Sequence, residues 1–199
     1  SSSSSSSEKT KYGTQAAIRV KERLGLLRLG IDKANVVKQR FPNAQFLEFG
    51  VHEGKDLVRM ATFLRSVEDK KRSTYTTFHG FDSFEGLPED WINGQIGTDD
   101  KPFHKKGAFD TGGESPNVEH LRNHMKIREQ PQQQPQPLHV QFHKGWFHES
   151  LPQFLDETDH GDEPVAFVHA DADLYTSTIT VLEILCSRTL LRKGSILVF

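Results

Sequence analysis

The sequence predicts an α/β fold in which helices cover both faces of a doubly wound, mostly parallel, Rossmann-like sheet. Three observations support this prediction. Short apolar runs recur along the chain and alternate with helical patterns. Each run ends in an acidic residue or a glycine, and open α/β sheets bind ligands at the carboxyl ends of their strands. The first run, in Gln45–Gly54 (QFLEFGVHEG), passes through two glycines into a helical pattern.

The segment Gln45–Gly54 predicts the first strand and a ligand-binding loop. Glu48 lies at the carboxyl end of its apolar run, while Gly50 and Gly54 permit tight turns and a close approach of a ligand to the backbone. A helix is expected next, over Lys55–Ser66, because its apolar residues have helical spacing. These residues are Leu57, Val58, Ala61 and Leu64. An ordinary strand-to-helix turn is the alternative interpretation of the two glycines.

Before this segment we expect a disordered serine-rich stretch over residues 1–13 and a helical cap over residues 14–44. The pattern of the cap predicts two amphipathic helices with a break near Gly25–Gly30. These helices are expected to pack against the sheet edge, with closure over a ligand site as the alternative. Residues 45–199 form the expected ligand-binding domain, which we expect to be incomplete because the sequence ends within the fifth predicted strand.

The composition favours a protein that binds a small molecule. The 199 residues carry 25 Lys and Arg against 27 Asp and Glu, with a pI near 6.5, so the basic field typical of nucleic-acid binding is missing. No apolar run approaches the roughly 20 residues that span a bilayer. The single cysteine, Cys186, fits a reducing, cytoplasmic location and is expected to be a core thiol. We expect no nucleic-acid or membrane partner, and a homo-oligomer is compatible with this composition.

A second strand is predicted over Thr76–Asp82 and again ends in an acid. Glu48 and Asp82 together would suit a ligand with an amine and a vicinal diol, because carboxylates accept hydrogen bonds from both groups. The alternative for Asp82 is an Asx turn or a helix cap in the sequence FDSFEG.

The long segment Ser83–Gly113 predicts a folded lid, because its internal aromatic residues argue against disorder. These residues are Trp91, Phe103 and Phe109. A helix is expected over Ser115–Arg128, with its first residue as N-cap. His120 and His124 share a face of this helix, and we expect a solvated face rather than a metal site because no third ligand is evident. Residues 130–137 are a low-complexity surface insertion.

A third strand is predicted over Leu138–Phe142, followed by a ligand-side turn at Gly145. Trp146 could wall an aromatic ligand ring such as adenine, although a place in the core is equally compatible. A short helix is expected over Ser150–Glu157, capped by its first residue and with Pro152 in its first turn.

The run Val165–Val168 predicts a buried fourth strand, which is followed by Asp171 and Asp173. If the chain stays extended there, residues i and i+2 point to the same side and both carboxylates face one cleft. Two converging carboxylates suit a hard divalent cation such as Mg²⁺. The alternative is that one acid caps the next helix, predicted over Thr176–Leu191. A fifth strand is predicted over Gly194–Phe199.

These motifs resemble the class I S-adenosylmethionine-dependent methyltransferases, whose first motif is similar to the E-x-G-x-x-x-G spacing of Glu48–Gly54. More narrowly, four segments resemble the macrocin O-methyltransferase family of sugar O-methyltransferases: HGFDSFEGLPEDW (His79–Trp91), KGAF (Lys106–Phe109), KGWFHESLP (Lys144–Pro152) and HADADLYTST (His169–Thr178). The similarity spans about residues 46–199 and implies the class I methyltransferase fold. The combination of FDSFEGLP with DxDLYxST is specific.

The resemblance also implies which residues bind S-adenosylmethionine. Glu48 would bind the methionine amino group, and Gly50 would let the carboxylate approach the backbone, within the loop that Gly54 completes. Asp82 would hold the ribose hydroxyls, with Ser83 beside them.

The other matched residues would complete the site. Gly145 and Trp146 would flank the adenine. Asp171 would be the first ligand of a magnesium ion, and Asp173 would be a neighbouring ligand or the general base. The resemblance implies that further acids follow the fifth strand.

The expected activity is direct methyl transfer from S-adenosylmethionine to a hydroxyl group of a sugar or another small natural product. An NAD-dependent dehydrogenase is the enzymatic alternative, disfavoured because the first loop lacks the G-x-G-x-x-G pattern. A cofactor-binding fragment without turnover is the other alternative. We expect residues 1–199 alone to fold weakly or to be inactive.

Overall fold

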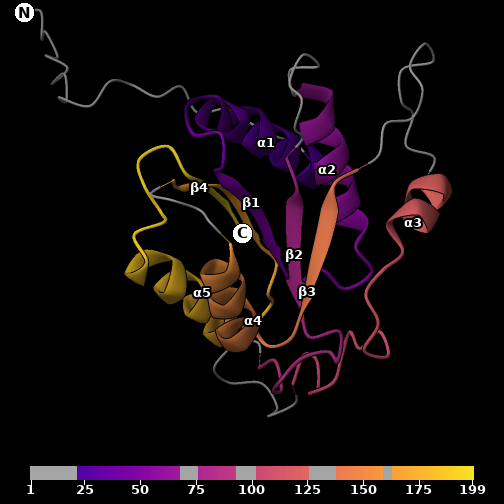
Figure 1. Ribbon diagram of the computed structural model, residues 1–199. Helices are drawn as coiled ribbons and strands as arrows, with labels where there is room; N and C mark the ends of the chain where they lie inside the picture. The colour runs from indigo at the N-terminus through magenta and orange to yellow at the C-terminus, as the bar shows by residue number, and fades with distance from the viewer. Residues whose placement is uncertain (1–21, 68–75, 93–101, 126–137, 159–162) are drawn as a thin grey trace, which may run out of the picture.

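The computed structural model describes residues 22–67, 76–92, 102–125, 138–158 and 163–199. These residues form a parallel five-stranded sheet with the strand order β3-β2-β1-β4-β5 (Figure 1). The strands are β1 Gln45–Phe49, β2 Phe78–Asp82, β3 Val140–Lys144, β4 Val165–Ala170 and β5 Ile196–Val198. The predicted α/β fold is confirmed. The order reverses between β1 and β4, and ligands of such sheets bind beside this reversal.

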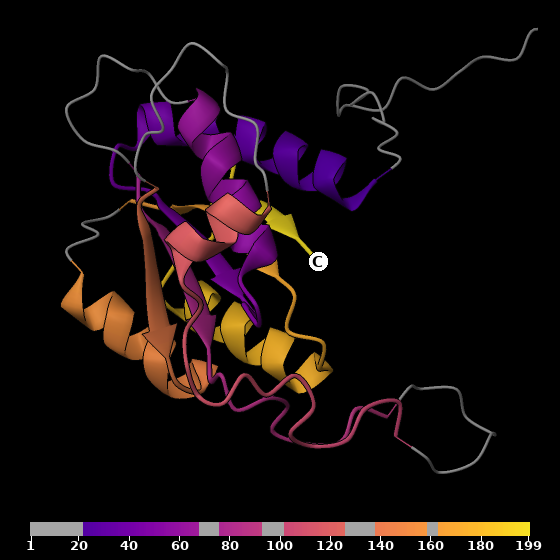
Figure 2. The same cartoon turned by 90° about the vertical axis from the view of Figure 1, so that its right-hand side faces the viewer.

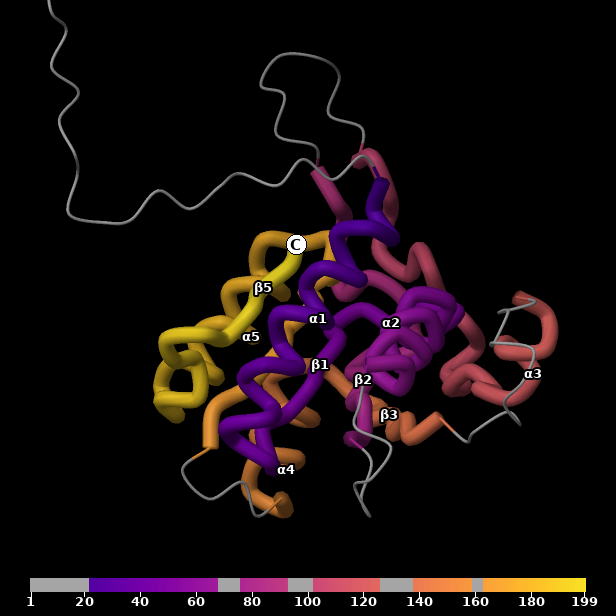
Figure 3. The backbone as a smooth tube through the Cα atoms, turned by 90° about the horizontal axis from the view of Figure 1, so that it is seen from above, coloured from indigo at the N-terminus to yellow at the C-terminus, as the bar shows by residue number. Residues whose placement is uncertain are grey.

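Helices lie on both faces of the sheet. They are α1 Arg23–Arg40, α2 Lys55–Val67, α3 Val118–His124, α4 Phe147–Glu157 and α5 Tyr175–Ser187. Helices α1 and α2 cover one face, as the view from above shows, while α4 and α5 pack together on the other (Figures 1 and 3). Helix α3 packs beside α2.

The strands β1, β2 and β4 are buried on both sides, which explains their continuous apolar runs. Toward α1 and α2, the rings of Phe46, Phe78 and Phe167 pack with centroids 5.9–6.2 Å apart. Toward α4 and α5, Phe49 and Phe81 stack with centroids 4.9 Å apart. The two layers of packed aromatic rings hold the strand ends in fixed positions beneath the loops that follow them.

Helix α1 is continuous, so the predicted break near Gly25–Gly30 is wrong. Gly30 is buried inside the helix, and a Cβ atom there would lie 2.7 Å from Cε2 of Phe167 and 3.3 Å from Cγ2 of Val198. The glycine therefore allows α1 to pack closely on β4 and β5. We had interpreted Gly30 as part of a helix break, but this residue serves the packing of the helix on the sheet.

Two predicted helix starts are also wrong. Helix α3 begins at Val118, where the side-chain oxygen of Asn117, rather than Ser115, accepts a hydrogen bond of 2.9 Å from the backbone N–H of His120. Helix α4 begins at Phe147, three residues before the predicted cap Ser150. The Ser150 hydroxyl lies inside this helix and donates to the backbone oxygen of Trp146 at 3.1 Å.

Helix α5 follows Leu174, and no side chain among the described residues caps it. The alternative in which Asp171 or Asp173 caps this helix is therefore wrong. The prediction of a core thiol is wrong as well, because Cys186 is exposed. The buried residues of α5 are Val181 and Leu185, and the next residue turns away from the sheet.

Several sequence predictions lie outside the described residues: the serine-rich stretch, residues 14–21 of the cap, residues 93–101 of the lid, residues 126–128 of a helix and the 130–137 insertion. The proposed domain boundaries therefore stay predictions. His120 and His124 are exposed, with ring centroids 4.1 Å apart, and no group of three metal-ligating side chains occurs among the residues that the structure describes. Within the same residues, no helix has the length and apolar character needed to cross a membrane.

Candidate functional site

A cleft of about 960 Å³ opens at the carboxyl ends of β1, β2 and β4. It is bounded by the loops after these strands, by the start of α1 and by the segment that follows β2. The predicted site residues that line it are Glu48, Gly50, Gly54, Asp82, Ser83, Trp146, Asp171 and Asp173. Side chains from distant parts of the sequence therefore meet at one place.

Glu48 forms the floor of the cleft. Its side chain is 2% exposed, and its Oε1 lies 2.9 Å from Nδ1 of His169, which is also 2% exposed. The second oxygen, Oε2, is buried, and none of the residues that the structure describes donates a hydrogen bond to it. Burial raises the pKa of Glu48 to about 7, the hydrogen bond to His169 counteracts this rise, and the charges of Asp56 and Asp171 add to it. A buried acceptor of this kind is unfavourable unless a ligand satisfies it.

Gly50 allows the ends of β1 and β4 to converge beside Glu48. Its φ is +85°, and a Cβ atom there would lie 2.2 Å from the backbone oxygen of Asp171. The backbone N–H of Asp171 donates to the oxygen of Phe49 at 2.9 Å, which ties the two strand ends together. Any side chain at position 50 would separate them. Gly54 has a φ of +75° and closes the same loop.

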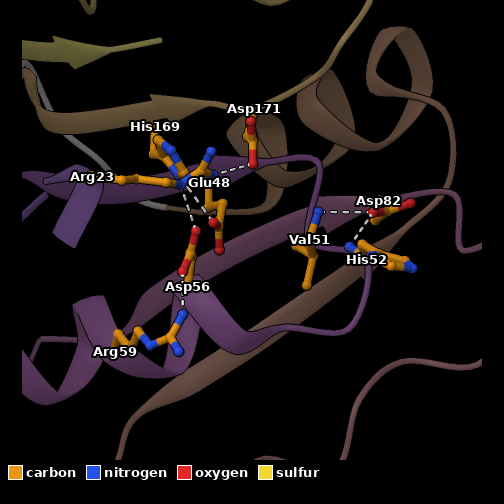
Figure 4. Close-up of polar contacts among 9 residues, drawn as sticks. All are labelled: Arg23, Glu48, Val51, His52, Asp56, Arg59, Asp82, His169 and Asp171. Atoms are coloured by element: carbon orange, nitrogen blue, oxygen red, sulfur yellow. Dashed lines mark hydrogen bonds and ion pairs between the residues drawn. The ribbon is translucent and has the colours of Figure 1, made fainter. Parts of the chain in front are cut away.

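The carboxylate of Asp82 organises the loop after β1. Its Oδ2 accepts hydrogen bonds from the backbone N–H groups of Val51, at 2.8 Å, and His52, at 2.7 Å (Figure 4). Its Oδ1 accepts from the N–H of Phe84 at 2.8 Å, which is the Asx turn considered as an alternative. A carboxylate has about four acceptor sites, so these bonds leave limited room for ribose hydroxyls. The buried Ser83 lies beside it and accepts from the N–H of Glu85 at 3.1 Å.

The turn after β3 places an aromatic side chain in the cleft. Gly145 adopts a φ of +137° and donates its N–H to the backbone oxygen of Asp82 at 3.0 Å, so it supports the cleft without lining it. Trp146 follows at the start of α4 and lines the cleft as a half-buried ring. Its position is compatible with a wall for a flat ligand group.

Asp171 takes part in a chain of ion pairs that the sequence did not predict. Its Oδ2 pairs with Nη2 of Arg23, from the first turn of α1. Nε of the same Arg23 donates to Asp56 at 2.9 Å, and Asp56 also accepts from Nη1 of Arg59 at 2.8 Å (Figure 4). These pairs connect the end of β4 with the starts of α1 and α2, directly beside Glu48.

Asp173 faces the same cleft by a different backbone path from the one predicted. Its φ is +57°, so the chain does not stay extended after Asp171 and the i, i+2 argument is wrong. Asp173 is exposed at the cleft. Partial burial and the charge of Asp171 raise the pKa of its carboxyl, while His104, His52 and Arg23 oppose the rise.

The segment after β2 folds back on itself as an arm at the carboxyl ends of the strands (Figure 2). Antiparallel bridges join Glu85 to Asp110 and Trp91 to His104. Phe109 from this arm lines the cleft, and its ring contacts that of His52 with centroids 5.6 Å apart. The described parts of the predicted lid are therefore folded.

Sequence reasoning missed four residues of the site: Arg23, His52, Asp56 and His169. Arg23 lies in a segment whose pattern predicts only an amphipathic helix, so no local signal marked it. His169 did carry a local signal. It alternates with Asp171 and Asp173 and lies at the end of a strand, as Glu48 does on the neighbouring strand.

Comparisons with known proteins agree on the type of protein. The sequence profile of the macrocin O-methyltransferase (TylF) family matches residues 14–198. The demethyldecarbamoylnovobiocin O-methyltransferase of Streptomyces niveus is 27% identical over 132 residues, which are 66% of this chain and 43% of that protein. The chain thus spans less than half the length of this curated relative.

Two solved structures share the fold. The crystal structure of CalS11, a calicheamicin methyltransferase, superposes with a TM-score of 0.57 at 24% identity, covering 88% of this chain and 64% of the other. The O-methyltransferase NovP superposes with a TM-score of 0.52 at 26% identity, covering 83% and 60%.

Proposed function

Because this chain belongs to the macrocin O-methyltransferase family, we propose that it transfers the methyl group of S-adenosylmethionine to a hydroxyl group. The proposed acceptor is a sugar or another small natural product, as the family description and the name of the Streptomyces niveus relative suggest. In this proposal the cleft described above binds the cofactor.

The observation that carries the proposal is the unpaired Oε2 of Glu48. A carboxylate oxygen that is buried at the end of β1 and lines a cleft is suited to an ammonium group. S-Adenosylmethionine brings such a group on its methionine end. Asp82 and Trp146 line the same cleft, and we assign them to the ribose and the adenine.

The residues around the acceptor position then serve the transfer itself. When bound, S-adenosylmethionine supplies an electrophilic methyl group, and the acceptor oxygen displaces the sulfur of S-adenosylhomocysteine from it. Asp173 takes the proton of the acceptor hydroxyl, since the raised pKa of its carboxyl makes it a better base than an ordinary aspartate. The arm that carries Phe109 excludes water, and correct positioning alone can contribute about 7–11 kcal/mol.

We also propose Asp171 and Asp173 as ligands of a magnesium ion. Mg²⁺ is often held by one or two carboxylates and keeps several water ligands, so two aspartates meet its minimum requirement. Such an ion would orient the acceptor hydroxyl and lower its pKa. Arg23 already pairs with Asp171, however, and the ion would have to displace this guanidinium. For this reason we assign no step of the transfer to the metal.

Calorimetric titration with S-adenosylmethionine tests the proposal. The wild-type chain should bind it, and Glu48→Gln, which removes the charge but keeps the shape, should bind at least about tenfold more weakly. If Glu48→Ala bound as tightly as the wild type, the cofactor assignment would be wrong.

A thermal-shift comparison of S-adenosylmethionine with NAD separates the proposed enzyme from a dehydrogenase. Only the former should raise the melting temperature, because the chain lacks the phosphate-binding glycine pattern. Turnover is then tested by following S-adenosylhomocysteine release with demethyldecarbamoylnovobiocin as a first acceptor. Binding without release, for every acceptor tried, would favour the cofactor-binding fragment.

A further inference from the structure

The end of the cleft around Glu48 is strongly acidic. Asp56 and Asp171 lie near Glu48, and the charges of both disfavour its ionised form. This arrangement suits the ammonium of an amino acid but not its carboxylate, which would approach three groups of the same charge. A zwitterionic ligand therefore needs a cation at this place, close to Oε2 of Glu48.

Arg23 is suitably placed to be that cation. It lines the cleft from the first turn of α1 and pairs with both Asp56 and Asp171, so its guanidinium lies within the acidic group rather than at its edge (Figure 4). These two partners use one N–H at Nε and one at Nη2, out of the five that a guanidinium carries. Its side chain is 53% exposed, so the remaining donors can meet a ligand.

Arg59 is the other arginine in this group, and it is less suited. Among the described residues its ion-pair partner is Asp56 alone, and it lies about one turn after Asp56 on α2. It therefore provides a matched control, with the same charge and one shared partner.

We propose that Arg23 binds the α-carboxylate of S-adenosylmethionine while Glu48 binds the ammonium on the same carbon. This inference rests on the proposed function and adds a residue that the motifs do not contain. A planar guanidinium binds carboxylates through paired hydrogen bonds, so the ligand carboxylate accepts from the N–H donors of Arg23 that Asp56 and Asp171 leave free.

The test compares S-adenosylmethionine with decarboxylated S-adenosylmethionine, which lacks only the carboxylate. Calorimetry is performed on the wild-type chain and on Arg23→Met, Arg23→Lys and Arg59→Met. We expect the wild type to prefer S-adenosylmethionine. Arg23→Met should weaken S-adenosylmethionine binding by about 10- to 100-fold and decarboxylated ligand binding by less than about threefold. Arg23→Lys should weaken S-adenosylmethionine binding less, because lysine keeps the positive charge but lacks the paired N–H donors of a guanidinium.

Arg59→Met should leave the preference for the carboxylate in place. Equal losses of both ligands in Arg23→Met would overturn the proposal, as would a loss of the preference in Arg59→Met instead. If Arg23→Met fails to fold, the wild-type measurement remains a test. Equal affinities of the wild type for S-adenosylmethionine and its decarboxylated form would overturn the proposal without any variant. Failure of the wild type to bind S-adenosylmethionine would overturn the proposed function as well, whereas binding without discrimination overturns this inference alone.

Discussion

Nδ1 of His169 lies 2.9 Å from Oε1 of Glu48, and the two residues are register partners on the parallel strands β4 and β1. The sheet itself therefore sets this contact. His169 contacts Oε1, and Oε2 is the oxygen to which no described residue donates, so it is the one most available to a ligand. The pair gives Glu48 a fixed orientation at the floor of the cleft.

The affinity for S-adenosylmethionine should depend on pH through Glu48. Burial raises the pKa of this carboxyl to about 7, so it is mainly protonated below that pH and ionised above it. The ligand ammonium requires the ionised form, and binding at lower pH must release a proton. We expect the dissociation constant to fall by up to about tenfold per pH unit from about pH 5.5 to pH 7, and to level off above. Calorimetry across this range measures it.

Glu48→Gln provides the control for this pH dependence. It cannot ionise, so its weaker binding should stay nearly constant over the same pH range. A wild-type profile as flat as that of the variant would contradict the assignment of the ammonium to Glu48.

Gly50→Ala should destabilise the protein far more than Gly112→Ala. Both glycines have similar φ values, +85° and +79°, so the backbone strain of an added side chain is about 1–2 kcal/mol in each. A Cβ at position 112 would meet no atom of the described residues within 4 Å, whereas one at position 50 would lie 2.2 Å from the backbone oxygen of Asp171. We expect a total loss above about 3 kcal/mol for Gly50→Ala in urea denaturation. Equal losses would show that β1 and β4 can separate without penalty.

Asp173→Asn should reduce turnover without changing cofactor binding. The amide cannot take the acceptor proton, so kcat should fall by about 10²- to 10⁴-fold, while the dissociation constant of S-adenosylmethionine stays within about twofold. The raised pKa of the Asp173 carboxyl also predicts that the acid limb of the wild-type rate lies above the range of an ordinary aspartate. Unchanged kcat in the variant would assign the base to another residue.

Magnesium dependence is tested by chelation. If Asp171 and Asp173 hold an ion, EDTA should abolish turnover, and added MgCl₂ should restore it. Asp171→Asn should then need more magnesium for half-maximal activity, because it keeps the shape but loses a charged ligand. Full turnover in EDTA would restrict both aspartates to roles without a metal.

The sequence predicted the sheet and most of the cleft because both follow from local patterns. Runs such as Val165–Val168 mark buried strands, and parallel strands bring their carboxyl ends together, so Glu48, Asp82 and Asp171 could be placed at one edge. The bounds of strands were less certain: β3 begins at Val140 rather than Leu138. Pairing, rather than apolar character, decides where a strand begins.

The remaining parts of the site depend on contacts between distant segments. Arg23 and Asp171 are far apart in sequence, and nothing in the helical pattern around Arg23 indicates its partner. The left-handed backbone of Asp173 was also missed, because aspartate is enriched at positive φ but adopts it in only a small minority of cases. The predictions of helix caps at Ser115 and Ser150 were wrong for a related reason, since tertiary packing also determines where a helix begins.

The contact between Gly30 and Phe167 also sets the position of Arg23, which lies on the same helix. Arg23 lies two turns before Gly30 on α1, about 10 Å along the helix axis. Phe167 is fully buried among other rings, so a methyl group at position 30 is expected to push α1 away from the sheet. The guanidinium would then move with it. If Arg23 binds the ligand as proposed, the ligand affinity also depends on Gly30, which lies about two helical turns away along α1.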